Sequence, residues 1–73
     1  DQAYACGTGS FIYGGITATE FLQIASELSQ YKNIGGIDIV EVAPNLDLTQ
    51  NTSRLAATAI TSFLKPRIFE FVE

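Results

Sequence analysis

Residues 35–44 read Gly-Gly-Ile-Asp-Ile-Val-Glu-Val-Ala-Pro and carry the most information about the architecture. The segment has no polar face of its own, which is typical of a strand covered on both sides in a parallel sheet. We predict a strand at residues 34–43 that ends before Pro44, because proline has no N–H to donate to a neighbouring strand. A buried carboxylate is costly without a partner, so Asp38 and Glu41 indicate a polar site at one end of this strand.

The flanking sequence predicts a loop, then one helix on each side of the strand. Residues 1–16 contain four glycines and no persistent periodicity, which indicates a loop. Thr17 and Glu20 form an S/T-x-x-E capping box, and the apolar spacing behind them predicts a helix at residues 17–32. A second apolar stripe predicts a helix at residues 51–64, ended by Pro66. No element is assigned to the tail at residues 65–73.

One strand cannot satisfy its own backbone hydrogen bonds, so its sheet partners must come from residues or chains outside these 73 residues. The hydrophobic content of 47% is high for a domain of this size and fits a piece of a larger core better than an independent miniprotein. The sequence begins with Asp1 rather than methionine, and we expect it to be a portion of a longer chain. An independent interaction module is the alternative that an orphan strand disfavours.

The composition excludes several classes of function. A net charge of −4 with four basic residues argues against nucleic-acid binding, and the apolar runs are too short to span a membrane. With one cysteine and no histidine, the chain has neither an internal disulfide nor a Cys/His metal cluster. We expect Cys6 to be a small buried apolar residue rather than a nucleophile, because no histidine could activate it.

Three segments resemble motifs of the arginase/agmatinase/formimidoylglutamase (ureohydrolase) family. Residues 1–10, Asp-Gln-Ala-Tyr-Ala-Cys-Gly-Thr-Gly-Ser, and residues 14–17, Gly-Gly-Ile-Thr, resemble the family patterns D-P-x-[FY]-x-P-x-T-G-[TS] and G-G-[LI]-T. Residues 36–44 resemble G-x-D-[IV]-x-E-[VI]-x-P, and residues 51–57 are similar to the final family helix, T-x-x-[LT]-A-A. The resemblance covers residues 1–64, and agmatinase-like members are the most similar.

The resemblance implies an α/β fold, namely a three-layer α/β/α sandwich with a mainly parallel sheet. This chain would supply only its C-terminal loop, helix, strand and helix, within one domain. The implied activity is hydrolysis of the C–N bond of a linear guanidino or amidine substrate with two Mn²⁺ ions. Agmatine, giving putrescine and urea, is the expected substrate, while arginase, formimidoylglutamase and guanidino-acid hydrolase activities stay open.

The family's metal-ligating histidines and aspartates have no counterparts in this sequence, so the chain alone is expected to be inactive. Glu41 matches the family acid that contacts the substrate's guanidinium group, although a structural carboxylate is its simpler interpretation. Asp38 is expected to orient neighbouring groups, and Asp1 matches a family aspartate that does not bind metal. Thr8 and Ser10 match polar loop positions near the metal site, or are ordinary turn hydroxyls.

The sequence departs from the family where Gln2 and Cys6 replace prolines and where residues 10–13 are bulkier and more aromatic. These departures lie beside the expected site and leave the substrate open. A metal-free ureohydrolase-like binding or regulatory subunit is the alternative function. By the same resemblance we expect a homo-oligomer, a trimer or hexamer, that binds a small molecule. The lack of disulfides and targeting signals leads us to expect a cytoplasmic location.

Overall fold

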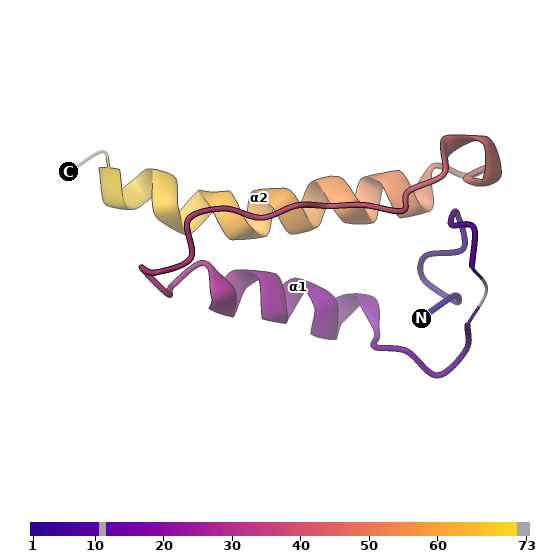
Figure 1. Ribbon diagram of the computed structural model, residues 1–73, viewed down its shortest axis with the longest axis horizontal. Helices are drawn as coiled ribbons and strands as arrows, with labels where there is room; N and C mark the ends of the chain where they lie inside the picture. The colour runs from indigo at the N-terminus through magenta and orange to yellow at the C-terminus, as the bar shows by residue number, and fades with distance from the viewer. Residues whose placement is uncertain (11, 72–73) are drawn as a thin grey trace.

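The computed structural model describes residues 1–10 and 12–71, and the side chains as far as residue 68. It contains helix α1 (Ala18–Leu28), the short 3-10 helix η1 (Pro44–Leu46) and helix α2 (Asn51–Phe71). The two long helices point in the same direction, and the extended segment between them runs back the opposite way (Figure 1). The described part of the chain therefore consists of a helix, an extended segment that runs back in the opposite direction, and a second helix parallel to the first.

Helix α1 begins where the sequence predicts. The Thr17 backbone N–H donates to Glu20 Oε1 at 2.9 Å, and the Glu20 N–H donates to Thr17 Oγ1 at 3.1 Å, so the capping box is confirmed. These hydrogen bonds lower the pKa of the Glu20 carboxyl, the backbone N–H of Thr17 being the larger cause.

The predicted end of this helix, at residue 32, is wrong. Helix α1 stops at Leu28, and the chain then tightens into a turn in which the N–H groups of Gln30 and Tyr31 bond three residues back. Such bonds commonly close the last turn of an α-helix, because they satisfy carbonyls that the helix leaves free.

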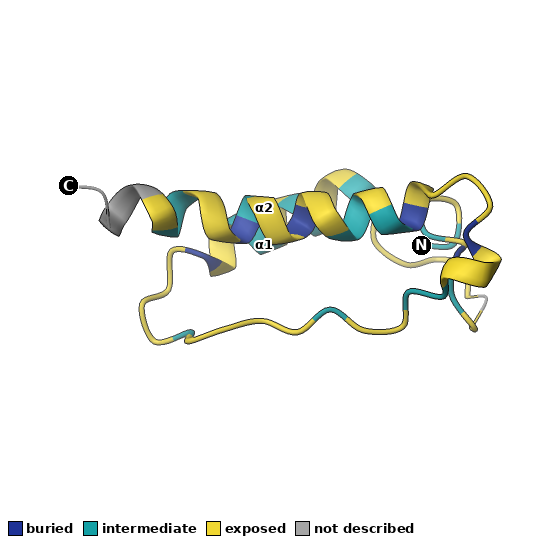
Figure 2. Cartoon of the chain, turned by 90° about the horizontal axis from the view of Figure 1, so that it is seen from above, coloured by how far each residue is buried: buried dark blue, intermediate teal, exposed yellow. Residues whose placement is uncertain are grey.

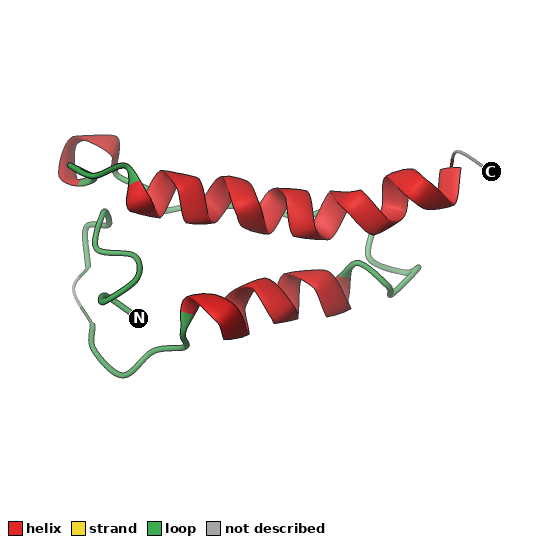
Figure 3. Ribbon diagram, turned by 180° about the vertical axis from the view of Figure 1, so that it is seen from behind, coloured by secondary structure: helices red, strands yellow, loops and turns green. Residues whose placement is uncertain are grey.

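The predicted strand at residues 34–43 is not formed, and no strand occurs among residues 1–10 and 12–71 (Figure 3). The segment is extended, yet most of it is exposed rather than covered on two faces; Ile37 and Val40 are among its exposed residues. A strand needs a neighbouring backbone along its length, and apart from the Gly7 carbonyl, which accepts from the Ala43 N–H at 2.8 Å, the described chain brings no distant backbone group to this segment. The three-layer sandwich is therefore not seen in the described part of the chain.

The core between the helices is very small. Helix α1 packs along α2, and only Ala59 and Phe63 of the described apolar residues are fully buried, at 1% and 2% exposure. Figure 2 shows most of the extended segment as exposed, while buried positions occur on α2. A core of this size favours the expectation that other parts of a larger protein cover the exposed apolar residues.

Pro66 does not end α2 as predicted, because the helix continues through it to Phe71. Proline inside a helix removes one backbone hydrogen bond and costs about 3 kcal/mol. Arg67, the next residue, offsets this cost by donating to three carbonyls beyond the end of α1: Ser29 O at 3.1 Å, Tyr31 O at 2.9 Å and Ile34 O at 2.7 Å. Its guanidinium also lies 4.4 Å from the centre of the Phe63 ring.

Helix α2 is capped at its other end by Asp47, which is only 4% exposed. Asp47 Oδ1 accepts from the Thr52 N–H at 3.0 Å, and Oδ2 accepts from the Ser53 N–H at 2.9 Å and the Ser53 hydroxyl at 2.6 Å. The Ser53 hydroxyl is the main cause that lowers the pKa of Asp47, and the backbone donors add to it, whereas burial acts in the opposite direction.

Replacing Arg67 by methionine should destabilise the protein by about 2 kcal/mol, because three charge-assisted hydrogen bonds to the end of α1 are lost. Equilibrium unfolding in urea measures the change. The matched control is Lys65→Met on the same helix, which removes an exposed cation and should change stability by less than about 0.5 kcal/mol. Equal effects of the two substitutions would contradict the role of Arg67.

Asp47→Asn should lower stability at neutral pH and flatten the loss of stability in acid. The folded-state pKa of Asp47 lies below its ordinary value of 3.8, so the charged cap stabilises the fold above that value and is lost as the pH falls through the folded pKa. Urea unfolding at a series of pH values from about 6 to about 3 tests this linkage. The control Glu27→Gln removes an exposed carboxylate from α1. If the stability of Asp47→Asn falls with decreasing pH as steeply as that of the wild type, the assignment of Asp47 is wrong.

Candidate functional site

The Asp1 carboxylate organises the loop at residues 1–16. Its Oδ1 accepts from the Ala3 N–H at 2.8 Å, and its Oδ2 accepts from the N–H groups of Gly14 at 2.8 Å and Gly15 at 3.0 Å. Gly14 has φ +85°, a conformation that glycine adopts without strain. Gly15 leaves no room for a side chain, because a Cβ there would lie 2.9 Å from the Asp1 nitrogen. Both oxygens of Asp1 are therefore occupied by backbone donors.

Three of the predicted site residues gather around one depression, which we call the loop hollow. It has a volume of about 240 Å³ and is lined by Asp1, Gln2, Ala5, Thr8, Ser10, Ile12 and Gly15. The Thr8 hydroxyl donates to the Ser10 carbonyl at 2.9 Å, so the Thr8 side chain also fixes the path of the loop. Gln2 Oε1 is buried and has no hydrogen-bond partner in the described part of the chain. The sequence identified Gln2 only as a departure from a family proline.

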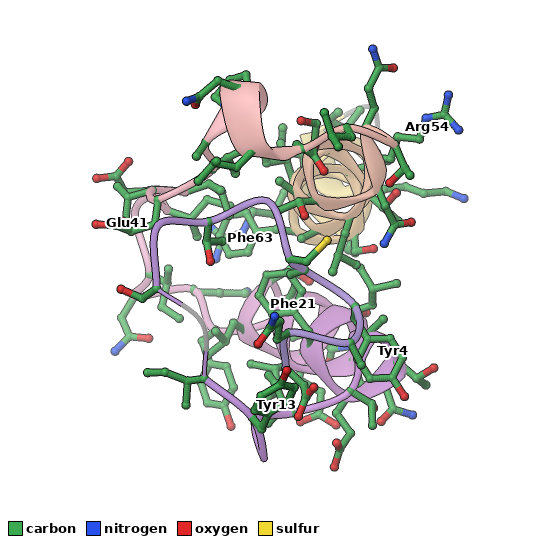
Figure 4. All side chains as sticks on the ribbon, turned by 90° about the vertical axis from the view of Figure 1, so that its right-hand side faces the viewer. Tyr4, Tyr13, Phe21, Glu41, Arg54 and Phe63 are labelled. Atoms are coloured by element: carbon green, nitrogen blue, oxygen red, sulfur yellow. The ribbon has the colours of Figure 1, made fainter. Side chains whose placement is uncertain are left out.

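Glu41 is exposed and lies on the extended segment, on the side away from both helices (Figure 4). Its backbone has φ +74°, the left-handed region that a glutamate rarely occupies. Such a conformation costs on the order of 1 kcal/mol or more, and it is concentrated at functional sites. Val40 and Val42, the neighbours of Glu41 on either side, line the same hollow, as residues two positions apart on an extended chain do.

That shared hollow, of about 140 Å³, connects the segment of Glu41 to the loop. Thr8 lines it together with Val40 and Val42, the neighbours of Glu41 on either side. Asp38 lies elsewhere: it is exposed and lines a separate depression of about 450 Å³ with Arg67 and the face of α2 around Phe63. The structure thus groups Asp1, Thr8 and Ser10, places the segment of Glu41 beside them, and does not bring Asp38 to the loop hollow.

Gly7 connects the loop to the end of the extended segment and to the beginning of α2. Its N–H donates to Thr52 Oγ1 at 2.9 Å, and its carbonyl accepts from the Ala43 N–H at 2.8 Å. A Cβ at Gly7 would lie 2.6 Å from Asp47 Cβ, so only glycine fits. From the sequence, Asp47 and Thr52 fall among several capping candidates in a polar turn at residues 45–52, and no role at the site was predicted for them or for Gly7.

The expectation that Cys6 is buried is wrong, because its side chain is exposed. It precedes Gly7, whose backbone takes the interior position at this point of the loop. The residues present also do not fit a metal pair. Among the side chains of residues 1–10 and 12–68, His, Cys, Asp and Glu form no group of three that could hold a metal ion, and both oxygens of Asp1 are engaged by N–H groups. In the part of the chain that the structure describes, neither long helix has the length and apolar character needed to cross a bilayer.

Comparisons with known proteins agree on one family. The sequence profile of the Arginase family matches residues 1–65. A formimidoylglutamase from Halalkalibacterium halodurans is 39% identical over 72 residues, which are 99% of this chain and 23% of the relative. From Bacillus subtilis, a formimidoylglutamase is 40% identical over 89% of this chain and 20% of the relative, and an agmatinase is 40% identical over 88% of this chain and 22% of the relative.

The chain thus spans about a fifth of the length of these relatives. No solved structure matches it significantly. The profile match covers most of the chain, and the motifs at residues 1–10, 14–17 and 36–44 lie inside the matched range. The chain belongs to the arginase family.

Proposed function

We propose that this chain is part of a binuclear-metal hydrolase that cleaves the C–N bond of a linear guanidino or amidine compound. Membership in the arginase family and relatives named formimidoylglutamase and agmatinase support this reaction class. Agmatine is the first substrate to test, and formimidoylglutamate is the second because the relatives include both kinds of enzyme.

The observation that carries the proposal is the placement of Glu41. An exposed carboxylate on a left-handed backbone, beside the loop of Thr8, is poised to receive a ligand rather than to fill a core. A guanidinium or amidine is a planar cation with several N–H donors, which a carboxylate binds by short, charge-assisted hydrogen bonds. We therefore assign substrate binding to Glu41.

The remaining predicted residues support the site in this proposal. Asp1 holds the loop through three backbone N–H groups, and Thr8 and Ser10 line the loop hollow near the substrate. Asp38 faces a different depression and would orient the segment rather than contact the substrate.

The two Mn²⁺ ions of the proposed enzyme would be held by residues outside this chain, since the described residues do not fit a metal pair. In such enzymes the metals supply a hydroxide nucleophile from water at neutral pH. The chain by itself is accordingly proposed to be inactive. The extended segment at residues 34–43 would become a strand of the α/β/α sandwich once its sheet neighbours are present. Assembly into a trimer or hexamer and a cytoplasmic location are proposals of the same kind.

In the full-length protein, Glu41→Gln should lower turnover of agmatine about 100-fold or more, because the amide cannot offer a negative charge to the substrate cation. Urea release measures activity, and metal analysis should find the manganese content unchanged. The control is Glu27→Gln, which removes an exposed carboxylate on α1. Near-normal turnover in the Glu41 variant would overturn the assignment, and a wild-type protein without activity on any linear amidine would overturn the proposed function.

A further inference from the structure

We propose that Gly7, Asp47 and Thr52 form a positioning unit, here called the loop junction, that sets the loop hollow against Glu41. The proposal rests on the proposed function, since these residues would hold the substrate-binding site of that function in its correct geometry. None of the three is a catalytic residue. They would act through the backbone of the loop and of the extended segment.

Both backbone polar groups of Gly7 are committed to different parts of the chain. Its N–H is held by the Thr52 hydroxyl on α2 at 2.9 Å, and its carbonyl holds the Ala43 N–H at 2.8 Å. Each bond spans more than thirty residues of sequence, so neither arises from local turn geometry. A second tie runs in parallel, because Asn51 Nδ2 donates to the Tyr4 carbonyl at 2.7 Å.

Asp47 fixes the position of Thr52, whose hydroxyl accepts from the Gly7 N–H. It accepts from the Thr52 N–H and from both the N–H and the hydroxyl of Ser53, and it is buried beside Gly7. Thr52 is itself only 4% exposed, so its side chain is held by packing as well as by the cap. A largely buried network of hydrogen bonds of this kind rigidifies the backbone that it joins.

The hydrogen bonds of Gly7 lie within two residues of the site, both in the loop and in the extended segment. Gly7 precedes Thr8, which lines both the loop hollow and the hollow beside Val40 and Val42. Ala43 follows Glu41 by two residues. If the loop junction loosened, the loop hollow and Glu41 would shift relative to each other, and displacements of about 1 Å in a binding geometry can lower rates by about 100-fold.

The test compares Thr52→Val with Thr52→Ser in the full-length protein. Valine has nearly the shape of threonine but leaves the Gly7 N–H without its acceptor, whereas serine keeps the hydroxyl. We expect Thr52→Val to lower kcat on the best amidine substrate about tenfold or more, and Thr52→Ser to retain activity within about twofold. Activity is measured per folded molecule, well below the Tm of each variant, with the manganese content determined in parallel.

Amide hydrogen exchange gives a second readout that does not depend on the reaction. Thr52→Val should speed the exchange of the amides at residues 7–10 and at Ala43, while the amides of the middle of α1 stay as in the wild type. If the wild-type protein hydrolyses no amidine, the proposed function fails, but this comparison still tests the loop junction. A merely structural cap would lower Tm in Thr52→Val without changing kcat of the folded protein, and that result would overturn the proposal.

The wild-type protein alone provides a further check if Thr52→Val does not fold. The Gly7 amide should exchange at least about tenfold more slowly than the amide of Gly9, which is exposed and has no atom within 4 Å of its Cβ position. Equal exchange at Gly7 and Gly9 would mean that the Thr52 hydroxyl does not hold the loop, and it would overturn the proposal.

Discussion

Backbone N–H and C=O groups need hydrogen-bond partners, and this requirement governs the chain between Ile34 and Ala43. The segment is anchored only at its ends: Arg67 holds the Ile34 carbonyl, and the Gly7 carbonyl holds the Ala43 N–H. Between these anchors, residues 35–42 make no backbone hydrogen bond within the described part of the chain. The backbone N–H and C=O groups of residues 35–42 are therefore free to pair with a neighbouring strand.

Polar contacts at both ends of α2 explain why the helices and the loop stay together despite so small a core. Arg67 joins the end of α2 to the end of α1, and Asp47 joins the beginning of α2 to the loop through Thr52 and Gly7. Hydrogen bonds at the two ends of α2 therefore stabilise the arrangement of helices and loop, as apolar packing does in larger domains. The loop hollow lies at one of these ends, where the loop meets the return of the chain.

Local features were predictable from the sequence because their determinants lie within a few residues of one another. The capping box of Thr17 and Glu20 and the start of α2 at Asn51 are examples. Features set by distant residues were not predictable. The hydrogen bond of Gly7 with Thr52 spans 45 positions. Helix α2 continues beyond Pro66, where Arg67 donates to carbonyls more than thirty positions earlier in the sequence. Family motifs led to the prediction that Asp1, Thr8, Ser10 and Asp38 support the site, and the structure gathers the first three around the loop hollow but places Asp38 elsewhere.

We propose that residues 34–43 become a strand when sheet neighbours from outside this chain are present. Amide hydrogen exchange of residues 35–42, measured in the full-length protein and in the isolated 73-residue chain, tests it most directly. We predict strong protection in the full-length protein and rapid exchange in the isolated chain. Rapid exchange in the full-length protein, or equal protection in both, would contradict the claim.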